Sequence, residues 1–169
     1  MNNHTRSLKD IFDFNSTMMR VGLADLTNEH AIHRVRDGQG SSISFLVGHM
    51  LSSRVGAMKL LGQATENPYS ELFGGNVGAL DGSTYPDITH LYEDWVEVSQ
   101  SFSDALAALS EADVLRPNKG FPIPDQTVRG ALMFWAWHES YHLGQVGLIR
   151  TELGYPSLQE RLYAEMQPS

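Results

Sequence analysis

The sequence predicts an all-α protein, folded as a four-helix bundle. Four long segments repeat apolar residues at helical spacing, turn-forming residues separate them, and no segment of useful length alternates as a strand does. The chain of 169 residues has the length of one domain, and it contains no stretch with the composition of an interdomain linker. We therefore expect a single helical domain spanning residues 1–169.

The first two long helices are expected at about residues 7–28 and 42–62. Apolar side chains recur there at every third or fourth position, which places them on one face of a helix. The sequence Gly-Gln-Gly at 38–40 separates the two segments. Ser41 or Ser42 follows this break, and either hydroxyl can accept a hydrogen bond from the free N–H groups of the second helix.

The last two long helices are expected at about residues 86–110 and 125–154. Both continue the helical spacing of apolar residues, and the second is followed by Gly154 and then Pro156. Glycine and then proline after a periodic segment is a typical stop signal for a helix. The residues from 157 to 166 can form a short fifth helix.

Two long loops connect these helices, at about residues 64–86 and 111–126. Both are rich in glycine, proline and other turn-forming residues. Loops of this length are uncommon in compact domains unless they carry a function or a crossover between helices. We expect the two loops to surround the mouth of a site in the bundle.

The composition excludes several classes of function. There are 20 acidic and 12 basic residues, and the net charge of -8 argues against binding to nucleic acids or to anionic membranes. The chain contains no cysteine, which excludes disulfides, cysteine-based zinc or iron–sulfur sites and an internal thiol nucleophile. Since neither a signal peptide nor a membrane-spanning segment is recognisable, we expect a cytoplasmic protein.

Two histidines of the last long helix carry the strongest chemical signal. His138 and His142 are four residues apart, so their imidazoles lie above one another, and apolar neighbours such as Ala131 and Ile149 place them in the middle of the apolar face. Polar groups buried there need partners. A divalent metal ion is one such partner, and hydrogen bonds to side chains or water are the alternative. The spacing of four residues favours the metal.

A third ligand is expected from His49, in the middle of the second helix. It borders the apolar stripe of that helix, so an ordinary histidine between helices is the alternative interpretation. His30 and His33 are expected in a polar loop and His90 in a solvated first turn. Three histidines would leave coordination positions open, which is the pattern of catalytic rather than structural metal sites.

The sequences SISFLVGHMLSSR around His49 and HESYHLGQVGLIRTELG from His138 resemble the DinB-like family of four-helix-bundle metalloenzymes. The resemblance implies a three-histidine site for a divalent ion, either zinc, nickel or iron, and a homodimer. A few members of the family are S-transferases or isomerases that use a low-molecular-weight thiol. The resemblance therefore implies a metal-dependent enzyme acting on a small molecule, with a thiol-dependent S-transferase as its more specific form.

Two other functions stay open. The first is a non-catalytic bundle that binds a metal or a small ligand. The second is a zinc hydrolase, because the residues from His138 to His142 also match the His-Glu-x-x-His pattern, in which Glu139 would be the general base. We rank the hydrolase last, since Gly144 is one position too early for the extended peptidase pattern and no substrate-binding strand is expected.

Two further residues are weak candidates for a role beside the metal. Glu139 is expected either to accept a hydrogen bond from an imidazole or to be solvated. Gln145 lies one turn after the last histidine, and it is expected to orient a ligand or a histidine, or to fill a polar gap.

Overall fold

The computed structural model describes residues 3–63, 66–74 and 77–167. Helices joined by loops make up this part of the chain, which contains no strand; Pro117 and Thr127 form an isolated bridge. None of the described helices is long and apolar enough to cross a membrane. The predicted all-α class is confirmed.

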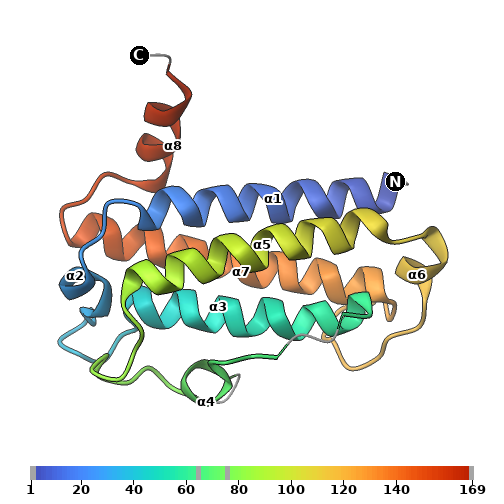
Figure 1. Ribbon diagram of the computed structural model, residues 1–169, viewed down its shortest axis with the longest axis horizontal. Coiled ribbons are helices and arrows are strands. Elements are labelled where there is room, and N and C mark those ends of the chain that lie inside the picture. Colours follow the sequence, from blue (N-terminus) through green and yellow to red (C-terminus); the bar gives the residue numbers. More distant parts are fainter. Residues whose placement is uncertain (1–2, 64–65, 75–76, 168–169) are drawn as a thin grey trace.

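Four long helices lie side by side along the molecule (Figure 1): α1 (Asn3–Leu23), α3 (Ile43–Met58), α5 (Ile88–Ala108) and α7 (Val128–Glu152). Helix α1 packs against α5 and α7, and α3 packs against the same two helices. Helices α1 and α7 run in one direction and α3 and α5 in the other. The parallel pair α3 and α5 requires a crossover along the bundle, and the long segment between them provides it.

The helix boundaries follow from local capping. The hydroxyl of Ser42 accepts a hydrogen bond from the N–H of Phe45 at the start of α3, and that of Thr127 caps α7 in the same way. Helix α3 continues as a 3-10 turn, η1 (Lys59–Leu61). Both starts agree with the expected positions, because a serine or threonine before an apolar periodic segment satisfies N–H groups that would otherwise lack partners.

The first helix ends earlier than expected. Helix α1 stops at Leu23, and Thr27 caps a separate short helix, α2 (Asn28–Ile32). Two further short helices interrupt the predicted loops, α4 (Ser70–Phe73) and α6 (Glu111–Leu115). Such short helices carry too few residues for a periodic apolar signal.

The expected fifth helix is present as α8 (Leu158–Met166), which projects from the bundle (Figure 1). The side chain of Leu158 packs closely against Gly22 of α1 and Gly147 of α7. A Cβ atom added at Gly22 would lie 2.7 Å from this side chain, and one added at Gly147 would lie 3.4 Å from it. The ion pair between Arg20 and Glu165 also joins α8 to α1.

The core consists of two apolar clusters, one towards each end of the bundle. The first contains Met50, Leu91 and Val146, and the second contains Phe12, Phe102 and Leu106.

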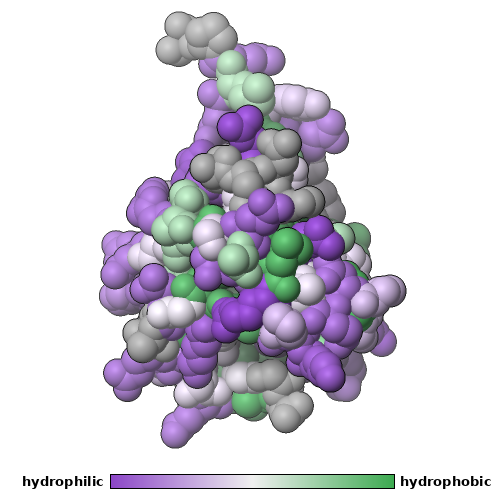
Figure 2. Space-filling model, turned by 90° about the vertical axis from the view of Figure 1, so that its right-hand side faces the viewer, coloured by the Kyte–Doolittle hydropathy of each residue, from purple (hydrophilic) through white to green (hydrophobic). Residues whose placement is uncertain are grey.

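The end that carries α6 is covered mainly by hydrophilic residues, with apolar ones in small separate groups (Figure 2). The candidate site lies between α3 and α7.

Candidate metal centre

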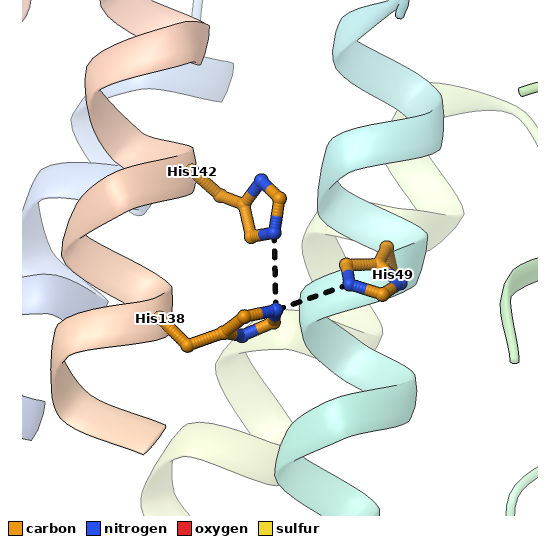
Figure 3. Close-up of side chains that lie close together, drawn as sticks. All are labelled: His49, His138 and His142. Carbon is orange, nitrogen blue, oxygen red and sulfur yellow. Dashed lines mark hydrogen bonds between the residues drawn. The ribbon is translucent and has the colours of Figure 1, made fainter. Parts of the chain in front are cut away.

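The structure brings together the three histidines singled out from the sequence (Figure 3). His49 comes from α3, and His138 and His142 come from successive turns of α7. The Nε2 atom of His138 lies 3.2 Å from Nε2 of His49 and 3.1 Å from Nε2 of His142. One potential ligand atom from each of the three residues lies within 4.8 Å of the others.

These distances suit one divalent ion. Nitrogen ligands at about 2.0–2.1 Å in tetrahedral geometry are separated from one another by about 3.3–3.4 Å, and by less in octahedral geometry. Hydrogen bonds among the three rings are a poorer alternative. A neutral imidazole has one N–H, so when two of the rings use theirs elsewhere, the single N–H of the third cannot serve both of its neighbours fully.

Two of the rings do use their N–H elsewhere. The Nδ1 atom of His49 lies 3.3 Å from the carbonyl oxygen of Phe73, and Nδ1 of His142 lies 2.6 Å from Oε1 of Gln145. Both oxygens can only accept, so Nδ1 of each ring donates and the lone pair of Nε2 faces the cluster. The Nδ1 atom of His138 is buried, with no hydrogen-bond partner in the described part of the chain.

The surroundings keep the three rings neutral. Burial and the neighbouring His142 and His49 lower the pKa of His138 from 6.5 to about 4. Burial also lowers the pKa of His49 and of His142, although a hydrogen-bond acceptor opposes the shift in each case. A metal ion binds the neutral form of imidazole, so at neutral pH the three histidines can bind an ion without first releasing protons.

Aromatic rings surround the histidines. Phe45 stacks on His49 with ring centroids 5.9 Å apart, and the Trp135 ring meets His138 edge-on at 5.3 Å. Each of the two long loops contributes to this shell. Phe73 of the first loop accepts the hydrogen bond from His49, and Phe121 of the second loop contacts Trp135. Of the expected first loop, residues 64–65 and 75–76 lie outside the described part.

The sequence matches a family model described as the DinB superfamily over residues 12–146. The chain belongs to the DinB superfamily. No curated protein matches the sequence. Among solved structures, it resembles YfiT from Bacillus subtilis, described as "a probable metal-dependent hydrolase with an unusual four-helix bundle topology". The match has a TM-score of 0.65 and 17% identity, covers 92% of this chain and 91% of YfiT, and shows a shared fold.

In this DinB superfamily member, the group of side chains that could hold a metal ion consists of histidines. Within the described residues, no aspartate, glutamate or cysteine joins His49, His138 and His142 as a fourth member of the group. An ion held there by three nitrogen atoms would keep coordination positions free for an external molecule.

The expected roles of Glu139 are wrong. Its side chain is only 2% exposed, so it is not solvated, and it forms an ion pair with Arg54 instead of accepting from an imidazole. Nη2 of Arg54 donates to Oε2 at 2.6 Å and Nε donates to Oε1 at 2.8 Å. A carboxylate with both oxygens bound to a guanidinium is unsuited to the role of general base.

The expected position of the histidine pair on α7 also needs correction. Glu139, Leu143 and Val146 occupy the buried side of this helix, whereas His138 and His142 are half-buried at its edge. The histidines therefore lie between the core and the surface. Such a position favours access by a small molecule.

Three other histidines, His30, His33 and His90, lie away from the cluster. His33 and His90 are exposed. His30 lies in α2 rather than in a loop, and its Nδ1 is 2.8 Å from the hydroxyl of Tyr155. Sequence reasoning missed Arg54, although it is the single Asp, Glu, Lys or Arg residue of α3, and that isolation in an apolar helix was a usable signal.

Proposed function

We propose that this protein is a metal-dependent enzyme acting on a small molecule, and more specifically a transferase that uses a low-molecular-weight thiol. The observation that carries the proposal is the convergence of three neutral imidazole nitrogens without a fourth protein ligand in the described residues. A closed set of four protein ligands would instead have favoured a purely structural or storage site.

Each of the three histidines has a defined part in this proposal. His49, His138 and His142 would hold a divalent ion, either zinc, nickel or iron, through Nε2. When bound, the ion polarises a coordinated thiol or water and lowers its pKa towards neutrality. The Phe73 carbonyl and the Gln145 amide hold two of the rings in the tautomer that binds metal.

The thiol must come from outside the chain. The sequence contains no cysteine, so a sulfur nucleophile can only be a cosubstrate. The aromatic shell around the histidines, including Phe45 and Trp135, would exclude water from a bound thiol and favour an uncharged electrophile. The net charge of -8 also disfavours strongly anionic substrates.

A metal-dependent hydrolase is the second candidate, because YfiT, which shares the fold, is described as one. The same three histidines would serve that reaction. The general base could not be Glu139, whose carboxylate is buried and bound to Arg54. A hydrolase of this kind would therefore differ from His-Glu-x-x-His peptidases in its proton acceptor.

A factorial assay separates the two candidates. The protein, stripped of metal and reloaded with zinc, nickel or iron(II), is incubated with model electrophiles and ester or amide substrates, with and without several thiols. We expect thioether products that require both metal and thiol and that disappear in His138→Ala. His90→Ala is the matched control, since His90 is exposed and outside the site. Metal-dependent hydrolysis without any thiol would overturn the transferase in favour of the hydrolase.

A further inference from the structure

A buried ion pair joins the two helices that carry the metal centre. The side chains of Arg54 on α3 and Glu139 on α7 are 1% and 2% exposed, and their two parallel hydrogen bonds form a bidentate contact. A bidentate arginine–carboxylate pair is directional and permits little relative rotation of the two groups.

The remaining helices of the bundle also reach this pair. On α1, the Ser16 hydroxyl accepts a hydrogen bond from Nη1 of Arg54 at 2.8 Å, and on α5 the Ser99 hydroxyl accepts from the same atom at 2.7 Å. The guanidinium also lies over the Trp95 ring, 4.2 Å from its centroid. Arg54 thus contacts all three other long helices from the centre of the bundle.

The carboxylate is held in a similar way. Oε2 of Glu139 accepts a second, longer hydrogen bond from Nδ2 of Asn15 on α1, at 3.4 Å. The same amide group also donates to the carbonyl oxygen of Ala136 on α7, at 3.3 Å. We call Arg54, Glu139 and their partners Asn15, Ser16 and Ser99 the polar node.

The polar node is directly connected to the metal centre through the backbone. Glu139 follows His138 in the sequence, and Arg54 comes five positions after His49, about 1.4 helical turns or about 7.5 Å along α3. Rotation of α7 or sliding of α3 would move both a histidine and a member of the node. The geometry of one pair therefore constrains the geometry of the other.

Stability alone is a poor explanation for this arrangement. Removing two charges from water is costly, and buried ion pairs can often be replaced by apolar residues of similar volume without loss of stability. Two helices that meet only through apolar faces, such as those on either side of the node, can pack in several rotations and registers. A buried polar contact between them can select one of these arrangements.

We propose that Arg54 and Glu139 are positioning residues that fix the register and rotation of α3 relative to α7, and thereby hold Nε2 of His49 opposite Nε2 of His138. This inference rests on the proposed metal site. It gives the glutamate of the His-Glu-x-x-His pattern a role in the shape of the site rather than in proton transfer.

The double variant Arg54→Met/Glu139→Leu tests the proposal, because it removes both charges and leaves neither one unpaired. Cobalt(II) is the probe, since its visible absorption reports coordination geometry and its affinity can be measured by competition with a chelator. We expect a helical, cooperatively unfolding protein whose cobalt affinity is roughly tenfold or more below wild type. The cobalt spectrum should also differ from that of wild type.

Two further variants complete the design. Leu106→Ala removes a buried side chain of the second apolar cluster; it should lower the melting temperature and leave cobalt affinity and spectrum unchanged. Arg54→Lys keeps the charge but not the bidentate contact, so it should change the cobalt spectrum even if the double variant fails to fold.

The results distinguish this proposal from the proposed function. If wild type binds one cobalt ion and a folded node variant keeps the wild-type affinity and spectrum, the positioning role is wrong and the metal site stands. If wild type binds no cobalt at the histidines, the metal site itself is wrong and the positioning role falls with it. If Leu106→Ala loses as much cobalt affinity as the node variants, the losses in the node variants come from lower overall stability, and the positioning role is wrong.

Discussion

Replacement of Gln145 by methionine should weaken metal binding without disturbing the fold. Methionine has a similar length and helix propensity but lacks the amide oxygen that accepts the hydrogen bond from His142. The bond is short, at 2.6 Å between Nδ1 and Oε1, and partly buried. The variant would leave His142 free to rotate and to take the tautomer whose Nε2 carries a proton and cannot bind metal.

The size of the effect follows from the strength of such bonds. One hydrogen bond contributes about 0.5–1.5 kcal/mol, and loss of a partner behind a metal ligand lowers affinity by about 10–100-fold. We expect roughly a tenfold loss for Gln145→Met, which corresponds to about 1.4 kcal/mol. Gln145→Glu keeps an acceptor at the same position and should retain wild-type affinity or exceed it.

The assay is competition between the protein and a chromophoric chelator for zinc or cobalt, at fixed pH and salt. Gln100→Met is the matched control, because Gln100 is exposed on α5 and bonds only to Asp104 among the described contacts. Unchanged affinity in Gln145→Met, or an equal loss in Gln100→Met, would refute the assigned role of the amide in orienting His142.

Three further predictions concern the loop, the pH dependence and a buried cation. Gly48→Ala would bring a Cβ within 2.3 Å of the Phe73 ring and displace the carbonyl that orients His49, so calorimetry should show weaker metal binding. The pKa of His138 in the folded protein, about 4, lies below its usual 6.5, so the metal-free protein should lose stability as pH falls from 6.5 towards 4. The urea midpoint should fall over this pH range, and it should fall less in His138→Phe. Arg150→Met removes a buried guanidinium bonded to Asp25 and should lower the free energy of unfolding by about 2–4 kcal/mol. An unchanged urea midpoint would contradict that estimate.

The architecture could be predicted from the sequence because the signals were long and local. Each of the four bundle helices carries apolar residues over several turns, and Ser42 and Thr127 mark two of the starts. The short helix α2 could not be predicted in the same way, since five residues give no periodic pattern. The parallel arrangement of α3 and α5 depends on a crossover whose path no local signal encodes.

The site was predictable to the extent that it lies on helices. The spacing of His138 and His142 places both rings on one side of α7, whatever the rest of the fold does. The burial of Glu139 was not visible from this spacing, because its partner Arg54 lies 85 residues away in the sequence. The contact between His49 and Phe73 could not be predicted either, because it uses a backbone carbonyl, which every residue type has.

The measurement that tests the central conclusion most directly is the metal content of protein purified without an affinity tag. We expect one divalent ion per chain in wild type, and none at this site in His49→Ala, His138→Ala or His142→Ala, whereas His90→Ala keeps it. Full metal occupancy in any of the three site variants, or wild-type protein that takes up no zinc, nickel or iron when each is supplied, would contradict the assignment.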